Sequence, residues 1–137
     1  MGLMGFFTQN QADMKQKVLI FDDDADILEV CTIVLETNGF EVTTQKDCED
    51  VLAKIDRYTP DVLLMDNKIP PLGGIEACRT IRGSAGHATL PIVFFSANQD
   101  VARLAGDAGA NHYIEKPFDL DTLVATLRKA ITTGAAS

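Results

Sequence analysis

The sequence predicts an α/β fold in which five parallel strands form one sheet that is covered by helices on both faces. Short apolar runs alternate along the chain with segments that have the hydrophobic period of a helix. Three of these runs, at 18–21, 62–65 and 92–95, are apolar throughout, which is typical of strands buried on both faces. Strands that alternate with amphipathic helices indicate a doubly wound parallel sheet.

The first half of the chain contains three strand–helix pairs. The strands are predicted at 18–21, 41–45 (a β-branched segment) and 62–65. The first helix runs from Asp26 to Asn38, where Asn38-Gly39 is a stop signal, and Asp24 and Asp26 are candidates to cap its start. The other two helices are predicted at 47–58 and 74–82 from their apolar faces.

The second half adds two more strands, at 92–95 and 113–114, and two more helices, at 100–108 and 119–132. Asp119 is the expected cap of the last helix. We predict a leader at 1–16 that is disordered or vector-derived, one domain at 17–132, and a tail at 133–137. We expect no effector domain after the last helix, so the chain is either a stand-alone protein or part of a longer one.

Length and composition fit one globular domain. The chain has 137 residues, a formal net charge of −8 and 46% hydrophobic residues, values that exclude a disordered or collagen-like chain. The acidic balance leads us to expect no direct nucleic-acid binding, and no run is long enough to cross a membrane. Cys31, Cys48 and Cys78 lack the spacing of a metal or disulfide site, which favours a reducing cytoplasm, and Cys31 and Cys78 are expected to be small buried hydrophobes.

Polar residues stand where the predicted strands end. In sheets of this type, ligands bind beyond the carboxyl ends of the strands. The residues placed there are Asp22, Asp23, Asp24, Asp66, Ser96 and Lys116. Acidic groups, one hydroxyl and one lysine are therefore expected to converge at one edge of the sheet.

This set of residue types predicts phosphoryl chemistry with a hard cation. Grouped carboxylates suit Mg²⁺, which is held by one or two of them and bridges to phosphate oxygens. A carboxylate can also take a phosphoryl group as a nucleophile, and Asp66 is favoured because it stands alone after a central strand. Lys116 would supply positive charge, and the Ser96 hydroxyl would donate to a phosphoryl oxygen.

At these residues the sequence resembles the receiver domains of two-component response regulators, over roughly residues 17–131. The resemblance implies the strand order 2-1-3-4-5. It implies that Asp66, within the segment Leu-Met-Asp-Asn-Lys-Ile-Pro, is the phosphoacceptor. It also implies that Asp23 binds Mg²⁺ directly and Asp22 through water, while the backbone carbonyl of Lys68 completes the site.

The resemblance extends to a switch and to partners. Ser96 matches the switch hydroxyl, Tyr113 the switch aromatic, and Lys116-Pro117 a motif with a cis peptide bond. The implied partners are a sensor histidine kinase or phosphotransfer protein and a downstream protein. The downstream protein would bind the face formed by the helix at 100–108, the last strand and the last helix. The implied domain is not a turnover enzyme. Lys68 and the length of 83–90 depart from the common pattern.

Two other functions compete with this interpretation. A phosphatase of the haloacid dehalogenase type also ends its first strand in Asp-x-Asp, but Asp26 stands where that family needs Thr or Val. A flavodoxin-like FMN site is opposed by the acidic cluster, which would repel a phosphate. Asparagine substitution at Asp66 and at Asp22 separates the receiver from the phosphatase. His87 is expected to be a solvated loop residue, and His112 is assigned no role.

Overall fold

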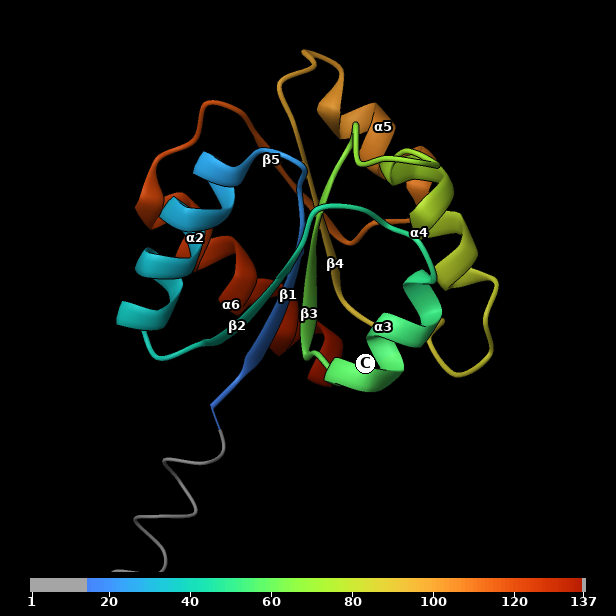
Figure 1. Cartoon of the computed structure of the whole chain (residues 1–137), viewed down its shortest axis with the longest axis horizontal. Coiled ribbons are helices and arrows are strands. Elements are labelled where there is room, and N and C mark those ends of the chain that lie inside the picture. The colour runs from blue at the N-terminus through green and yellow to red at the C-terminus, as the bar shows by residue number, and fades with distance from the viewer. Residues whose placement is uncertain (1–14, 137) are drawn as a thin grey trace, which may run out of the picture.

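The computed structural model describes residues 15–136 and consists of alternating strands and helices (Figure 1). The strands are β1 (Lys17–Phe21), β2 (Glu41–Gln45), β3 (Val62–Asp66), β4 (Ile92–Ser96) and β5 (His112–Glu115). The helices are α2 (Ala25–Thr37), α3 (Val51–Tyr58), α4 (Gly74–Arg82), α5 (Val101–Ala108) and α6 (Leu120–Ala136). All the predicted elements are present, and the largest differences from the predicted bounds are at the start of α3 and the end of α6.

The five strands form one parallel sheet in the order β2-β1-β3-β4-β5, which confirms the predicted fold and strand order. Every residue of β3 and β4 is buried, as their apolar sequences predict. The register pairs Phe21 with Met65, Asp66 with Phe95 and Ser96 with Glu115. The strands therefore finish at the same edge of the sheet, and the residues at their ends become neighbours.

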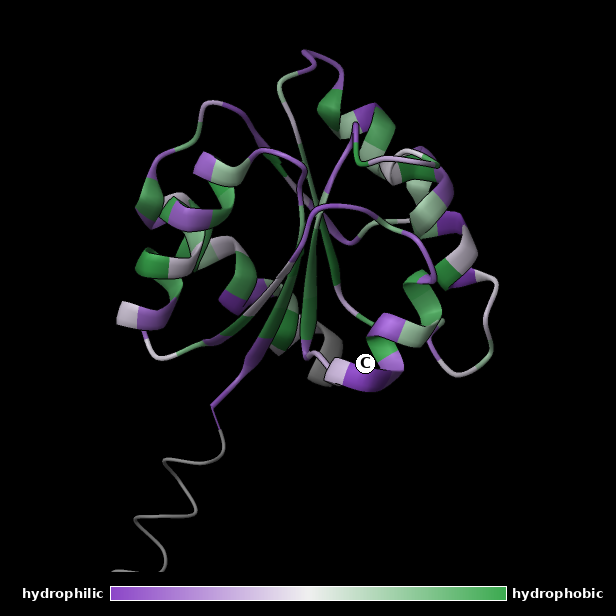
Figure 2. Ribbon diagram, viewed as in Figure 1, coloured by the Kyte–Doolittle hydropathy of each residue, from purple (hydrophilic) through white to green (hydrophobic). Residues whose placement is uncertain are grey.

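Helices cover both faces of the sheet. Helices α2 and α6 lie on one side, and α3, α4 and α5 lie on the other (Figure 1). Leu19 and Phe21 of β1 belong to the cluster with α3–α5, whereas Val18 and Ile20 belong to the cluster with α2 and α6. This two-residue alternation follows from strand geometry. Figure 2 shows the result, with hydrophobic strands in the centre and helices of mixed polarity around them.

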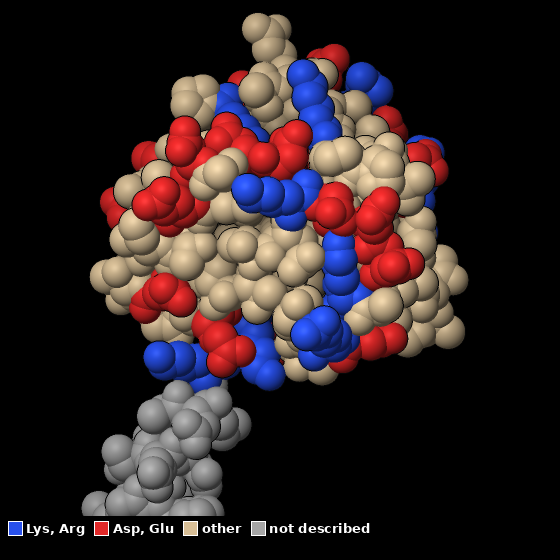
Figure 3. All heavy atoms as spheres, in the orientation of Figure 1, with Lys and Arg blue, Asp and Glu red and all other residues tan. Residues whose placement is uncertain are grey.

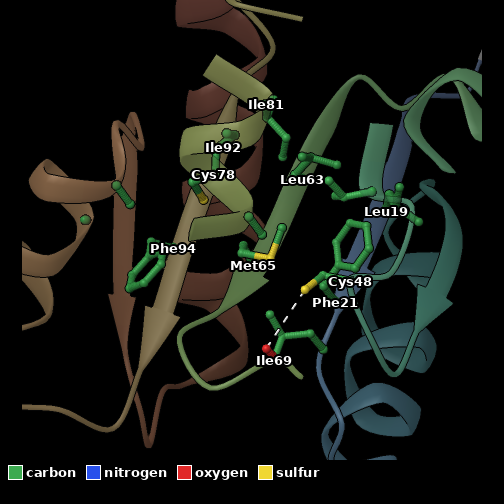
Figure 4. Close-up of a cluster of buried hydrophobic side chains, with 14 of the residues drawn as sticks. Leu19, Phe21, Cys48, Leu63, Met65, Ile69, Cys78, Ile81, Ile92 and Phe94 are labelled. Atoms are coloured by element: carbon green, nitrogen blue, oxygen red, sulfur yellow. Dashed lines mark hydrogen bonds between the residues drawn. The ribbon is translucent and has the colours of Figure 1, made fainter. Parts of the chain in front are cut away.

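The cysteines are part of these two cores. Figure 4 shows Cys48 and Cys78 among the side chains of the α3–α5 side, with the Cys48 Sγ 4.0 Å from the Ile69 carbonyl oxygen. All three cysteines are free and buried. Burial raises the pKa of Cys31 to about 11 and that of Cys78 to about 12. These thiols stay protonated and unreactive, which confirms their role as small buried hydrophobes.

Helix α2 begins and ends close to the predicted residues. The Asp24 carboxylate accepts hydrogen bonds from the amides of Asp26 (2.9 Å) and Ile27 (3.4 Å), so Asp24 is the cap. Asp26 does not cap the helix. It lies in the first turn, where its negative charge interacts favourably with the positive N-terminal end of the helix dipole. The helix ends at Thr37 with Asn38 as its C-cap, and Gly39 follows with a φ of +90°, which glycine adopts without steric cost.

Helix α3 begins at Val51, four residues later than the predicted 47–58 helix. Asp47 instead makes hydrogen bonds within the segment that precedes α3 and with its first turn. Its carboxylate accepts from the Glu49 amide (3.0 Å) and pairs with the Lys54 ammonium (2.7 Å). Asp50 has a φ of +50°, a left-handed conformation that cannot continue a helix. Local side-chain hydrogen bonds therefore delay the start of the helix.

The chain ends differ from the predicted boundaries where the structure describes them. Helix α6 continues to Ala136, so the predicted tail at 133–137 is helical over 133–136. Gly134 lowers helix propensity, but it does not remove a backbone donor and so does not stop the helix. Of the predicted leader, 1–14 lie outside the described residues, and Lys15 and Gln16 have no regular secondary structure. Within 15–136, no helix combines the length and apolar character of a membrane span.

The loop between α4 and β4 is tied to the body by His87. Its Nε2 atom lies 2.7 Å from the Asp56 carboxylate, and its Nδ1 atom lies 2.8 Å from the Ser84 hydroxyl. Only 15% of the side chain is exposed. The prediction of a solvated loop residue was wrong, because the loop folds back onto α3 and gives both ring nitrogens a partner.

Arg82, at the end of α4, joins the same loop to the turn before β5. Its guanidinium donates to the carbonyl oxygens of Gly109 (2.8 Å), Ala88 (3.2 Å) and Leu90 (2.7 Å) and to the Asn111 side chain (2.8 Å). Asn111 in turn accepts from the Ile92 amide at the start of β4 (2.8 Å). A single side chain therefore fixes the edge of the sheet that lies next to α5.

We expect Arg82→Ala to lower the free energy of unfolding by about 2–4 kcal/mol, because several acceptors of a charged donor lose their partner together. Arg82→Lys should recover little of this loss, since an ammonium cannot reach the same fork of acceptors. Arg79→Ala is the matched control: its side chain is 55% exposed, and we expect a loss below about 1 kcal/mol. Urea unfolding of the three variants measures the difference, and equal losses at Arg79 and Arg82 would contradict this role.

Candidate functional site

The predicted site residues meet in one cavity at the carboxyl edge of the sheet. Their side chains come from the ends of β1, β3, β4 and β5 and from the loops that follow. The cavity is lined by Asp22, Asp23, Asp24, Asp66, Lys68, Ser96, Ala97, Asn98 and Lys116. Figure 3 shows acidic side chains gathered over the upper part of the molecule, the end at which the strands finish. The structure thus brings together all the predicted candidates except Tyr113.

Lys116 links two of the strand ends. Its ammonium donates to Asp22 Oδ2 and to Asp66 Oδ1, each at 2.9 Å. Both carboxylates are almost fully buried, and the lysine side chain is 18% exposed. Lys116 precedes Pro117 through a cis peptide bond, as the resemblance implied. One cation is therefore shared by two buried anions.

The remaining oxygens of these carboxylates have backbone partners. Asp22 Oδ1 accepts from the Asp24 amide (2.9 Å), and Asp66 Oδ2 accepts from the Lys68 amide (3.2 Å). At Gly74, α4 approaches so closely that an added Cβ would collide with the Asp66 carbonyl oxygen. The Gly74 amide also donates to the Asn67 carbonyl oxygen (2.8 Å). Both aspartates are thus held by rigid backbone as well as by the lysine.

Three carboxylates offer a place for a cation. Asp22, Asp23 and Asp66 each present an oxygen within 4.8 Å of the others, and among the described residues they form the one such acidic group. Asp23 is exposed, whereas Asp22 and Asp66 are buried. Lys116 neutralises one of the three charges, so the group keeps a net negative charge. Hard oxygen donors with excess negative charge fit Mg²⁺.

The pKa values of Asp22 and Lys116 reflect how closely these charges are placed. Burial raises the pKa of Asp22, and the neighbouring charge of Asp66 acts in the same direction, against the Asp24 amide and Lys116. Burial by itself would lower the pKa of Lys116, but hydrogen bonds and charge attraction from Asp66 and Asp22 outweigh it, so the net pKa is raised. Lys116 therefore remains an ammonium.

Ser96 is buried at the end of β4, and its hydroxyl oxygen accepts from the Asn98 amide (3.0 Å). The hydroxyl hydrogen can therefore point into the cavity. Asn98 was not predicted; its own side chain accepts from the Asp100 amide (2.8 Å) and shapes the turn before α5. The signal for it was its position two residues after Ser96. Tyr113 lies outside the cavity and is 50% exposed.

Comparison with known proteins identifies the family. Residues 18–128 match the response regulator receiver domain, and this chain belongs to that family. It is 38% identical over 117 residues to the DNA-binding response regulator MtrA of Mycolicibacterium paratuberculosis. The match covers 84% of this chain and 51% of that protein, so the chain spans about half the length of such relatives. The family match favours the receiver interpretation over the phosphatase and flavodoxin-like alternatives.

Solved structures agree with this assignment. A putative response regulator of Chloroflexus aurantiacus superposes with a TM-score of 0.82 at 30% identity, covering 86% of this chain and 98% of that one. The receiver domain of the sensor histidine kinase PA1611 of Pseudomonas aeruginosa gives a TM-score of 0.79 at 30% identity, with the same coverage. That crystal structure has a magnesium ion in its active-site cleft.

The raised pKa of Asp22 gives a pH-dependent stability. The folded chain holds the Asp22 proton to a higher pH than the unfolded chain does, so ionisation above pH 3.8 lowers the free energy of unfolding until the raised pKa is passed. We expect Asp22→Asn to gain stability relative to the parent chain across this window and then to keep a constant advantage. Urea unfolding in chelator-containing buffer at a series of pH values measures the difference.

Asp47 is the control with the opposite sign. Its hydrogen bond with Lys54 lowers its pKa, so its contribution to stability is present above 3.8 and is lost as the pH falls through the lowered pKa. The Asp47→Asn variant should therefore lose stability relative to the parent chain as the pH rises through that lower window. Difference curves of the same sign for both variants would contradict the account of Asp22.

Proposed function

We propose that this receiver domain accepts a phosphoryl group on Asp66 in a Mg²⁺-dependent reaction and that the group switches a protein-binding surface. The observation that carries the proposal is the Lys116 ammonium held between Asp22 and Asp66, at 2.9 Å from each, beside the exposed Asp23. Family membership and the magnesium in the PA1611 receiver domain support it. Free buried cysteines suit a cytoplasmic setting.

The residues divide the chemistry among them. An Asp66 carboxylate oxygen attacks phosphorus, a P–O or P–N bond of the donor breaks, and the donor's group leaves with the electron pair. Lys116 stays beside Asp66 and offsets the charge of the arriving phosphoryl oxygens. The Ser96 hydroxyl donates to one of these oxygens. The carboxylates of Asp23 and Asp66 and the Lys68 carbonyl would hold Mg²⁺ directly, and Asp22 would hold it through water.

Mg²⁺ supplies charge neutralisation between the carboxylates and the phosphoryl oxygens when it is bound. The domain then loses the group slowly by hydrolysis of its own aspartyl phosphate and turns over no external substrate. A histidine kinase or phosphotransfer protein is the proposed donor. The proposed output is a downstream protein that binds the face of α5, β5 and α6. The relative MtrA is a DNA-binding response regulator. We propose no DNA binding for the residues described here.

The first test is labelling with acetyl phosphate. The parent chain should gain one phosphoryl group by intact mass in the presence of Mg²⁺ and none with a chelator, because the carboxylates otherwise repel the donor. Asp66→Asn should abolish the label, and Lys68→Ala should keep its Mg²⁺ dependence because the carbonyl remains. A label that persists in Asp66→Asn, or one that needs Asp22 and not Asp66, would overturn the proposal in favour of a different nucleophile.

The second test concerns output. Beryllofluoride is a phosphoryl mimic, and in the presence of Mg²⁺ we expect it to draw the Ser96 hydroxyl toward Asp66 and to let Tyr113 turn inward. Amide chemical shifts should then change through 100–128, well beyond the cavity. In Ser96→Ala the changes should shrink to residues that line the cavity. Shifts confined to the cavity in the parent chain would show that no switch reaches the α5–β5–α6 face.

A further inference from the structure

A buried aromatic ring lies beneath the Lys116 ammonium. The Lys116 Nζ atom is 4.2 Å from the centre of the Phe95 ring. Phe95 is the residue before Ser96 in β4 and is fully buried on the α2–α6 side of the sheet. An ammonium over a ring face within about 6 Å is attracted by the ring quadrupole, most strongly where water is excluded. The nitrogen that bridges Asp22 and Asp66 therefore has a third, uncharged partner.

The ring is itself fixed by the loop that carries the lysine. Phe118, two residues after Lys116, packs edge-on against Phe95 with ring centres 6.2 Å apart and an interplanar angle of 64°. This edge-to-face geometry is favourable for aromatic pairs. The Lys116 amide also donates to the Ser96 carbonyl oxygen (2.9 Å), which joins the same loop to the residue after Phe95. The ring and the lysine are thus held in one local unit.

We propose that Phe95 is a positioning residue that holds the Lys116 ammonium over the phosphoacceptor. This inference rests on the proposed function of Asp66. When Asp66 takes a phosphoryl group, the oxygen that attacks phosphorus gives up part of its negative charge, so the lysine's contact with Asp66 weakens. The ring contact does not depend on the charge of Asp66, and it keeps the ammonium in place while phosphoryl oxygens arrive.

A ring suits this task better than another carboxylate. A third anion beside Lys116 would hold the ammonium as well, but it would add to the charge that repels an anionic phosphodonor. The ring attracts the ammonium without adding net charge. Asp22 and Asp66 already supply the two anionic partners at 2.9 Å. The alternative role for Phe95 is to fill space in the core, and the experiments separate the two.

The first experiment measures position in the chain without metal or phosphodonor. A proton above a ring face resonates upfield, so the ε-methylene protons of Lys116 should be shifted upfield in the parent chain. Phe95→Leu should remove this shift. Phe94→Leu is the matched control, because Phe94 is equally buried but belongs to the cluster on the opposite face, where Figure 4 shows it. Normal lysine shifts in the parent chain, or no change in Phe95→Leu, would overturn the proposal.

The second experiment weakens the ring face without changing its size. Mono-, di- and trifluorophenylalanine placed at position 95 reduce the ring's attraction for a cation step by step while nearly preserving its shape. The initial rate of Asp66 labelling by acetyl phosphate with Mg²⁺ should fall in the same order, by about threefold to tenfold across the series. The same series at Phe94 should leave the rate unchanged. Equal rates across the Phe95 series, or the same fall at Phe94, would overturn the proposal.

The two experiments distinguish a failure of the proposed function of Asp66 from a failure of the positioning role of Phe95. If the parent chain is not labelled at all, the proposed function of Asp66 is wrong, and the Lys116 methylene shift still decides whether Phe95 holds the ammonium. If labelling proceeds on Asp66 but does not depend on the fluorine number at position 95, the proposed function stands and the positioning role of Phe95 is wrong. A fall that follows fluorine number at position 95 and not at position 94 supports both.

Discussion

The site depends on one cation placed among three anions. Asp22, Asp23 and Asp66 present oxygens within 4.8 Å of one another, and at an effective dielectric constant near 20 two unit charges at that distance repel by about 3.5 kcal/mol. Lys116 offsets this for the two buried members, which it contacts at 2.9 Å. The lysine reduces the repulsion between the carboxylates but does not neutralise the cluster. The remaining negative charge is what attracts a divalent cation.

Parallel register brings the strand ends and the residues that directly follow them to one edge of the sheet. The residue at or after each strand end is tied to the neighbouring strand: the Asp22 amide donates to the Gln45 carbonyl, the Asn67 amide to the Phe95 carbonyl and the Lys116 amide to the Ser96 carbonyl. Such backbone bonds extend the sheet into the cavity. The pocket is thereby built on rigid elements, which is what positioned phosphoryl chemistry requires.

Local patterns in the sequence were enough for the sheet and for most of the pocket. The apolar runs predict the strands, and the polar residue at each strand end predicts Asp22, Asp66 and Ser96 as neighbours. What the sequence could not show were pairings between distant segments: the Lys116–Asp22 bond joins residues 94 apart, and the His87–Asp56 bond joins residues 31 apart. The late start of α3 was not predicted for a different reason. The residues from 47 onward have a helical hydrophobic pattern, but hydrogen bonds of the Asp47 side chain compete with the helix there.

The place of the proposed output surface follows from where Ser96 and Lys116 lie in the sheet. Asp22 follows β1 and Asp66 ends β3, two strands in the centre of the sheet. Ser96 ends β4, which lies between β3 and β5, and Lys116 follows β5 at the edge of the described sheet. β5 has four residues, pairs only with β4 in the described sheet and leaves Tyr113 half exposed. A force exerted by a phosphoryl group on Ser96 and Lys116 would therefore act on β5 and on its one neighbour in the described sheet, β4. The helices packed against β5 are α5 and α6, so the proposed output face is made of the elements that contact this edge of the sheet.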